Sequence, residues 1–377
     1  MKKSVFPHVH GLVLLSLLGL IGCYSTSDGG PFGVSAEGGG FPFTHDDMEL
    51  VSQKAPPEGC LEVSADTLLE SDVPCIRVGA DGITIDLNGY TVHGPILPGG
   101  GTIWNDVEVR NGTVAGGAII LGSGTVLDQL IVRDHPGFTV EIGGGLITNS
   151  LFERNGSAVD LYWSWSSAGH FVEVRDCRFV ENRVGVAIQD DDNSKVINNH
   201  FEANEIGVYI WDEDFMGASN SEIRQNRFIR NDLGIWLNAV SEANGTQISK
   251  NLFQSNSSSG IAVSLGCAME YGNPFCAGRG TVIEKNKFIQ NGNDPRTLTG
   301  RLWLPDFSGE PYEVVADDGL TVFGIEELNT ADGVTVIGNT AIKNADLGID
   351  AAGVIDGGAN LARQNGNESE CVGVACR

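Results

Sequence analysis

The sequence predicts an all-β fold of stacked coils, and two patterns carry this prediction. A frame of the form Asn-x-Phe-x-x-Asn recurs along the chain, as in "NRFIRNDLGIWL" at 226–237. Each copy continues into a short stretch such as "GVYI" or "GIWL", in which apolar residues alternate with a period of two. That period is typical of β-strands, whereas an amphipathic helix repeats every ~3.6 residues.

Copies of the frame follow one another closely enough to be single turns of a solenoid. The phenylalanine returns at intervals of 22 to 35 residues: Phe152, Phe179, Phe201, Phe228, Phe253 and Phe288. A unit of this size, made only of short strands, cannot bury its apolar face alone, whereas stacked copies can. We therefore expect three short strands per coil, each phenylalanine lying on the next, and parallel pairing between coils.

Two asparagines of each copy are expected to form columns along the stack. The later one belongs at a corner, because asparagine tolerates turn geometry and its amide can bond the backbone or the next asparagine. It recurs at Asn155, Asn182, Asn204, Asn231, Asn256, Asn291 and Asn344. The earlier one forms an inward column: Asn199, Asn226, Asn251, Asn286 and Asn339. Cys177 takes the place of that column in its own coil, which predicts a small buried side chain and not a nucleophile.

These copies, which cover about 80–350, resemble the bacterial parallel β-helix repeat group of the pectate-lyase-like superfamily. The stretch "VGADGITIDLNGYTVHG" at 78–94 is similar to the first coil of that group, and 348–376 is similar to its closing segment. The resemblance implies a right-handed parallel β-helix, here a solenoid of about ten coils. It does not imply one activity, because the superfamily contains lyases, hydrolases, epimerases, phage tailspikes and non-catalytic proteins.

The chain is predicted to begin with a targeting segment at 1–22. Lys2 and Lys3 precede the apolar stretch "GLVLLSLLGLIG", which has the length of a signal-peptide core and is too short to span a membrane. Its end, "LIGC", resembles the bacterial lipoprotein signal and implies a lipid anchor on Cys23. The alternative is an ordinary secretory signal with a chance cysteine. Because Tyr24 follows, and not Asp, we expect an extracytoplasmic protein held at the outer membrane or cell surface.

Two further parts follow the signal. Residues 23–55 are rich in Gly, Ser, Thr and Pro and are predicted to be a flexible tether. Residues 56–377 are predicted to form the β-helix. Its terminal coils need covers, and the candidate caps are 56–78 and 351–377.

Charge and cysteine usage narrow the function. Removing Lys2 and Lys3 takes the net charge from −26 to −28, which excludes a nucleic-acid binder of the usual basic kind. Three close cysteine pairs fit disulfides in an oxidising compartment. These pairs are Cys60 with Cys75, Cys267 with Cys276, and Cys371 with Cys376.

Alternation sends a row of aromatic residues outward on one face of the coils. These are Tyr162, Tyr209, Trp211 and Trp236. Sugars stack on such rings, and coils about 4.8 Å apart would place the rings along an extended glycan. The alternative is that the aromatics suit strands or pack beneath a loop.

Chain segments of varying length follow this outward-facing strand and are expected to form a wall beside it. They are 163–170, 190–193, 211–220, 238–245 and 264–280. A face with a wall is a groove, where ligands bind. A longer insertion at about 292–318 is expected to close one end of the solenoid.

Six carboxylates of this wall lie in two neighbouring coils: Asp190, Asp191, Asp192, Asp212, Glu213 and Asp214. One interpretation is a calcium site, because calcium takes six to eight oxygen ligands. The other is a solvated acidic surface. A protein of this charge repels polyuronates unless cations bridge them, so the ligand is expected to be a neutral glycan or an anionic glycan held through calcium.

Catalytic motifs are indistinct. Asp190 and Asp212 could act as a carboxylate pair in a glycoside hydrolase, and Tyr209 as the base of a lyase. Arg183, His170 and His200 are further candidates for the lyase reaction. We therefore predict a membrane-anchored lipoprotein that binds polysaccharide, with lyase or hydrolase activity left open. The alternative is a non-catalytic structural or adhesive solenoid of the cell envelope.

Overall fold

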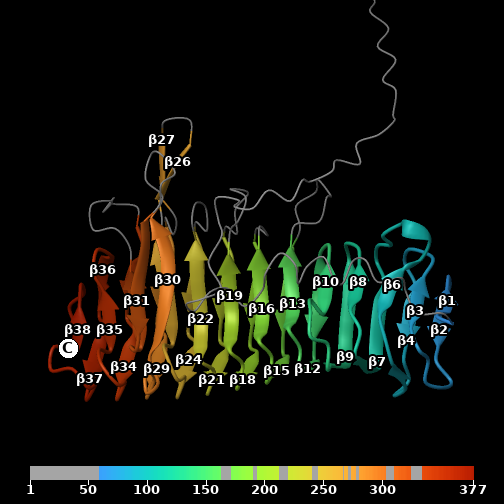
Figure 1. Cartoon of the computed structure of the whole chain (residues 1–377), viewed down its shortest axis with the longest axis horizontal. Coiled ribbons are helices and arrows are strands. Elements are labelled where there is room, and N and C mark those ends of the chain that lie inside the picture. The colour runs from blue at the N-terminus through green and yellow to red at the C-terminus, as the bar shows by residue number, and fades with distance from the viewer. Residues whose placement is uncertain are drawn as a thin grey trace, which may run out of the picture. The chain divides into compact units, whose positions relative to one another are not determined.

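The computed structural model describes residues 59–162, 171–189, 193–211, 220–239, 245–265, 267–270, 273–276, 280–302, 310–323 and 333–377. These ranges hold strands and one 3-10 turn, η1 (Gly99–Gly101). Figure 1 shows the strands stacked side by side along one axis. Among the described residues, no helix is long and apolar enough to cross a membrane.

One face of the stack is a 13-stranded parallel sheet, here called sheet A. Its strands are β1 (Leu61–Val63), β3 (Ile76–Val78), β6 (Ile96–Pro98), β8 (Ile119–Leu121), β10 (Val140–Ile142), β13 (Ser157–Tyr162), β16 (Val184–Gln189), β19 (Ile206–Trp211), β22 (Leu233–Ala239), β25 (Ile261–Leu265), β32 (Leu320–Phe323), β35 (Ile349–Ala351) and β38 (Cys371–Val372). Each strand pairs with the strand of the next coil, as the alternation predicted.

A second parallel stack, sheet B, supplies the next strand of each coil. Its strands are β2 (Thr67–Leu68), β4 (Thr84–Asp86), β7 (Glu108–Ala115), β9 (Thr125–Arg133), β11 (Gly145–Thr148), β14 (Val172–Arg175), β17 (Lys195–Ile197), β20 (Glu222–Arg224), β23 (Gln247–Ser249), β28 (Val282–Glu284), β33 (Thr335–Ile337) and β36 (Ile355–Gly358).

A third stack, sheet C, completes the coil and shares the long strands β7 and β9 with sheet B. Its other strands are β5 (Thr91–Val92), β12 (Leu151–Glu153), β15 (Arg178–Val180), β18 (His200–Glu202), β21 (Arg227–Ile229), β24 (Leu252–Gln254), β29 (Lys287–Ile289), β34 (Thr340–Ile342) and β37 (Leu361–Arg363). Two antiparallel hairpins interrupt the coils: β26 (Cys267–Glu270) with β27 (Asn273–Cys276), and β30 (Arg296–Leu302) with β31 (Glu310–Ala316).

The six phenylalanines stack as the repeat predicts. All are fully buried, and successive ring centroids lie 4.7 to 5.1 Å apart with planes 5° to 12° from parallel. A glycine at the start of four sheet A strands, β16, β19, β22 and β25, makes room for this stack. A Cβ on Gly207 would lie 2.6 Å from Cδ1 of Phe228 and 2.5 Å from the carbonyl oxygen of Gly234. Glycine is therefore required there by packing.

Both asparagine columns are present and buried. In the corner column, Oδ1 of Asn231 accepts hydrogen bonds from the backbone N (3.0 Å) and Nδ2 (2.9 Å) of Asn204. Nδ2 of Asn204 also donates to the carbonyl of Phe179 at 2.9 Å. Cys177 heads the inward column, where its backbone N donates to Oδ1 of Asn199 at 2.9 Å. The columns thus satisfy backbone groups that the corners would otherwise leave unpaired.

The ends of the described β-helix continue the coil pairing. The segments predicted as caps contribute β1 to β3 at one end and β36 to β38 at the other. Disulfides join Cys60 to Cys75 and Cys371 to Cys376, as predicted. Sheet A has thirteen strands, whereas the repeat predicted about ten coils. The difference arises because the terminal coils lack the phenylalanine frame.

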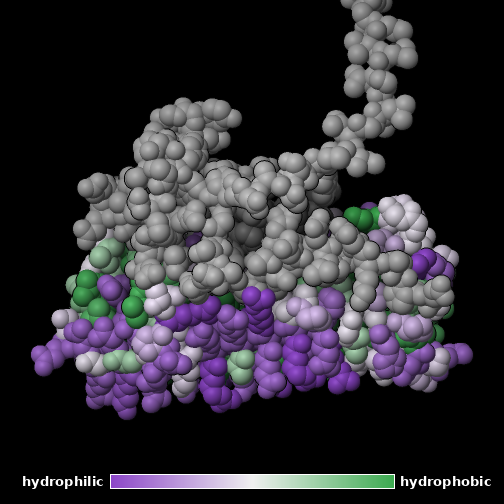
Figure 2. Space-filling model, in the orientation of Figure 1, coloured by the Kyte–Doolittle hydropathy of each residue, from purple (hydrophilic) through white to green (hydrophobic). Residues whose placement is uncertain are grey.

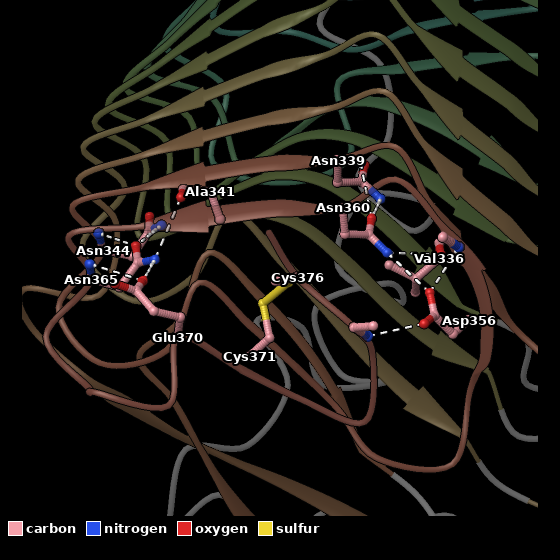
Figure 3. The surroundings of a disulfide bond; sticks show 12 residues. Val336, Asn339, Ala341, Asn344, Asp356, Asn360, Asn365, Glu370, Cys371 and Cys376 are labelled. Carbon is pink, nitrogen blue, oxygen red and sulfur yellow. Dashed lines mark hydrogen bonds between the residues drawn. A yellow bond between two sulfur atoms is a disulfide. The ribbon is translucent and has the colours of Figure 1, made fainter.

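The last coil ends the corner column with a carboxylate (Figure 3). The backbone N of Asn365 donates to Oε2 of Glu370 at 3.2 Å, and its Nδ2 donates to the same oxygen. Glu370 thus accepts the two hydrogen bonds that the next asparagine would accept in a longer stack. The disulfide Cys371–Cys376 follows directly and ties this segment down.

Candidate functional site

The outward residues of sheet A fall in one register column. From coil to coil the Cα partners are Glu141, Asp160, Ala187, Tyr209, Trp236, Ala262, Thr321 and Asp350. The strand neighbours of Tyr209, Val208 and Ile210, lie in the main core, whereas Tyr209 lies in a separate apolar cluster. The alternation therefore assigns inward and outward positions correctly. We call this set the outward column.

Tyr209 and Trp236 are buried, although both leave the coil on its outer side. Each is 2% exposed, and their ring centroids lie 5.1 Å apart at 46°. Asn238 donates to the hydroxyl of Tyr209 at 3.3 Å. The expectation that alternation exposes Trp236 to water is wrong, because a second layer of the protein covers this part of the face. A role in glycan binding stays a prediction for these two residues.

The covering layer is the hairpin β30–β31, which forms most of the insertion predicted at about 292–318. Its buried residues Leu298 and Ala316 belong to the same apolar cluster as Tyr209 and Trp236. Nη1 of Arg296 lies 3.0 Å from Glu205 and 2.9 Å from Asp232, which precede β19 and β22. The insertion thus packs on the middle coils of sheet A. The expectation that it closes one end of the solenoid is wrong.

The other predicted site residues lie at the edge of the described chain. Tyr162 and Trp211 end β13 and β19 in register, but their side chains lie outside the described residues, as does His170. The acidic residues of the predicted calcium site also lie outside them: Asp190, Asp191, Asp192, Asp212, Glu213 and Asp214. All five predicted wall segments follow a sheet A strand at the same edge of the sheet.

A pair of carboxylic acids begins the outward column. Glu141 on β10 and Asp160 on β13 are Cα partners. Asp160 is 6% exposed and its Oδ1 is buried without a hydrogen-bond partner. Burial, reinforced by the charge of Glu141, raises the pKa of Asp160 well above its ordinary value. Burial alone raises the pKa of Glu141, which is half-buried.

Sequence reasoning did not select this pair. The alternation in "SAVDLY" at 157–162 sends Asp160 outward together with Tyr162, but the stretch "LIVRDHPGFTV" at 130–140 departs from the repeated frame and does not align Glu141 with Asp160. The "VEI" alternation at 140–142 was the available signal. It shows that Glu141 faces outward, although the pairing with Asp160 depends on the stacking of the two coils.

A second acidic group lies toward the C-terminal end. One carboxylate oxygen from each of Asp317, Asp318 and Asp346 lies within 4.8 Å of the others, so this group could hold a cation. Asp318 is 2% exposed and accepts from the backbone N of Leu347 (2.8 Å) and from Oγ1 of Thr321 (3.2 Å). Burial, followed by the charge of Asp317, raises the pKa of Asp318 to about 8.

The other residues named from the sequence lie away from the outward column or in structural contacts. Cys177 is buried and unpaired, and burial raises the pKa of its thiol to about 12, which agrees with the predicted inert role. His200 lies on sheet C, away from the outward column, 3.0 Å from Glu202. Arg183 lies 3.8 Å from Glu205.

Cys267 and Cys276 are Cα partners in the hairpin β26–β27.

The side of the stack formed by sheet C is strongly polar. Figure 2 shows mostly hydrophilic residues on the side where Figure 1 places the sheet C labels. Exposed ion pairs such as Arg230 with Glu202 cover it. Isolated surface ion pairs of this kind are solvated and contribute little. The carboxyl pair on sheet A, with Asp160 buried and Glu141 half-buried, is therefore the better candidate for chemistry.

Parallel strands on three sides, with one phenylalanine stack inside, define the class of a parallel β-helix. Residues 105–275 match the family model described as a right handed beta helix region, and the chain folds as a right-handed parallel β-helix. No curated protein matches the chain.

Two solved structures are similar to the chain, both distantly. One is the A-module of the Azotobacter vinelandii mannuronan C-5 epimerase AlgE6, with 15% identity and a TM-score of 0.38 over 84% of this chain and 80% of that one. The other is a double mutant of the periplasmic alginate epimerase AlgG, with 11% identity and a TM-score of 0.32 over 88% and 82%. At these scores neither likeness bears on activity.

Proposed function

We propose that this protein binds polysaccharide outside the cytoplasm, on the outer face of sheet A around Glu141 and Asp160. The observation that carries the proposal is this carboxyl pair, because Asp160 is buried with an unpartnered oxygen. An unsatisfied buried polar group is costly, and functional sites are where such groups are retained. A ligand hydroxyl or ring oxygen would satisfy it.

The solenoid geometry favours a polymeric ligand. Coils repeat about every 4.8 Å, so an extended chain along the axis would meet the coils of Glu141 and Asp160, which lie outside the cluster beneath the hairpin, one after the other. A net charge of −26 over the whole chain repels polyanions. A carboxyl pair that keeps a proton suits a neutral glycan, which is the ligand class we propose.

The proposed location rests on two features. Disulfides Cys60–Cys75 and Cys371–Cys376 need an oxidising compartment, which supports a place outside the cytoplasm. The lipoprotein-like "LIGC" motif supports attachment of lipid to Cys23. Metabolic labelling with a palmitate analogue tests the anchor. Wild-type protein is expected to incorporate the label, and the Cys23→Ser variant is expected to lose both label and membrane association.

Calcium is part of the proposal only for anionic glycans. The predicted ligands are Asp190, Asp191, Asp192, Asp212, Glu213 and Asp214, and among the described residues Asp317, Asp318 and Asp346 could also hold a cation. An ion bound to the folded state raises the melting temperature by mass action. The melting temperature is expected to rise with millimolar calcium and return with chelator, and an unchanged value would exclude calcium.

A second function, a non-catalytic structural or adhesive solenoid, is favoured by the burial of Tyr209 and Trp236. Buried aromatic side chains beneath a hairpin stabilise the fold, which is the role that a structural solenoid would give them. A glycan array separates the two functions. Binding of neutral glycans that weakens at least tenfold in Asp160→Ala but not in Asp350→Asn supports the first. Absence of binding to any glycan supports the second.

A further inference from the structure

The later coils of sheet C differ in charge from the rest of the molecule. Their segments run from one corner to the next and carry strands β21, β24, β29, β34 and β37. The segments are 225–231, 250–256, 285–291, 338–344 and 359–365, and they contain none of the 49 acidic residues of the chain. They hold seven of its 23 basic residues, all exposed: Arg227, Arg230, Lys250, Lys285, Lys287, Lys343 and Arg363. We call this set the basic face.

The earlier coils of sheet C show that the fold does not require this composition. The equivalent segments there carry Glu153, Glu181 and Glu202, and arginines beside them form ion pairs with these acids. Within the described part of the chain, only Arg230 and Lys285 of the basic face form ion pairs, each with an acid outside the face. Its five other cations have no counter-charge among the described residues.

The cations of the basic face lie on both edges of the sheet as well as between them. Lys250 and Lys285 lie at the corner that precedes sheet C, with φ of 57° and 54°. Arg230 and Lys343 lie at the corner that follows it, with φ of 54° and 59°. Five coils that repeat every ~4.8 Å make the face about 19 Å long. It lies on the hydrophilic side that carries the labels β21, β24 and β29 (Figures 1 and 2).

We propose that the basic face binds the anionic headgroups of a membrane. Lipid phosphates form a plane of negative charge, and each Lys or Arg held near such a plane adds to the attraction. The many acids elsewhere in the chain do not cancel this attraction, because charges more than about 8 Å apart are largely screened in physiological salt. Those acids repel the other sides of the molecule from the same plane. The basic face is therefore the side that approaches it.

The arrangement of the cations favours a membrane over a linear anionic glycan. The row of Cα partners that begins at Arg227 continues through four more coils, and Lys287 is the one other cation in it. A single glycan chain along this row would meet few charges, whereas a plane of headgroups would meet the cations of both edges. The lipid proposed on Cys23 would also hold the protein at a membrane, and this second argument rests on the proposed anchor.

Binding to the membrane would leave the proposed glycan site free. Glu141 and Asp160 lie on sheet A, which forms a different side of the coil from sheet C. A molecule held by its basic face therefore keeps the outer face of sheet A away from the lipid.

Vesicle sedimentation tests the basic face without the anchor. The chain without the predicted signal, residues 23–377 with Cys23→Ser, carries no lipid. It is mixed with vesicles of phosphatidylcholine alone, or of phosphatidylcholine and phosphatidylglycerol in equal amounts. Binding is expected only to the anionic vesicles. It is expected to disappear in about 1 M salt, where the screening length falls to ~3 Å.

Charge substitutions locate the binding surface. One variant combines Arg227→Gln, Lys250→Gln and Lys287→Gln, and its Kd for anionic vesicles is expected to rise about 10²-fold. The matched control removes three positive charges outside the basic face, through Arg77→Gln, Arg154→Gln and Arg175→Gln. Its Kd is expected to stay within about threefold of the unsubstituted chain, because these charges are already paired with acids. Circular dichroism checks that both variants fold.

Several outcomes would overturn the proposal. They are equal binding to both kinds of vesicle, no binding to either, and equal loss of affinity in the two variants. Binding to soluble polygalacturonate that the first variant loses, without binding to vesicles, would make an anionic glycan the partner and overturn the membrane. These outcomes are separate from those of the glycan array and of the labelling of Cys23, which test the proposed function.

Discussion

Each asparagine of the inward column makes the same contacts with the coils on either side. Oδ1 of Asn226 accepts from the backbone N (2.8 Å) and the Nδ2 (3.1 Å) of Asn199, while its own Nδ2 donates to the carbonyl of Val196 at 2.8 Å. The residue before it, Gln225, has a φ of 60°, so the chain turns sharply there. The side chain thus supplies the hydrogen bonds that the turn cannot make.

Asn226→Ala is predicted to destabilise the protein by about 2 to 4 kcal/mol, because several buried partners lose their hydrogen bonds at once. The measurement is urea unfolding followed by circular dichroism. Arg227→Ala, on the neighbouring exposed residue, is the control and is expected to stay within about 0.5 kcal/mol of wild type. Equal stability of the two variants would show that the column is dispensable.

At the scale of elements, the glycine at the start of β16, β19, β22 and β25 limits which side chains that position of the strand can accept. A Cβ on Gly207 would overlap the Phe228 ring and the Gly234 carbonyl, whereas a Cβ on Gly79 would meet nothing closer than 3.5 Å. Gly207→Ala is predicted to cost about 1 to 3 kcal/mol through overpacking. Gly79→Ala is the control, and thermal unfolding that ranks the two variants in the opposite order would contradict the prediction.

The hairpin β30–β31 depends on contacts with coils far away in sequence. Arg296 bridges Glu205 and Asp232, and is 19% exposed. Arg296→Gln is predicted to loosen the hairpin, so that amides of 296–302 and 310–316 exchange hydrogen faster while those of 233–237 do not change. Mass spectrometry of peptides measures this. Lys287→Gln, on the exposed side of sheet C, is the control, and unchanged exchange at the hairpin would refute the role of Arg296.

At the scale of the whole molecule, buried acids make stability depend on pH. Burial raises the pKa of Asp160 well above 3.8, and that of Asp318 to about 8. An acid with a raised pKa in the folded state releases its proton on unfolding, so stability falls as pH rises from about 4 toward 8. Groups with a lowered pKa, such as Asp134 beside Arg154, lose their contribution only below about 3.8.

The melting temperature is therefore predicted to be higher near pH 5 than near pH 8, measured in EDTA so that no cation binds the acids. Asp160→Asn is expected to reduce this difference, because the amide cannot ionise. Asp134→Asn, on an exposed acid with a lowered pKa, is the control and is expected to leave the difference unchanged. A melting temperature that rises between pH 5 and pH 8 would contradict the prediction.

The repeated frame was sufficient to predict the coil. The positions of Phe228 and Asn226, and the alternation from Ile235 to Leu237, each specify a contact with the same position of a neighbouring copy. Such contacts need only the spacing between copies, which the sequence displays directly. The buried state of Cys177 followed in the same way, from its place in a column.

The sequence alone determined the β-helix, its interior columns and which residues leave the coil. Only the tertiary structure decided what happens to those outward residues. Trp236 is buried because a hairpin about 60 residues later in the chain folds back over it. Asp160 meets Glu141 because of a register between irregular coils. Repetition encodes contacts between equivalent positions, whereas contacts made by insertions and irregular coils depend on how the whole chain packs.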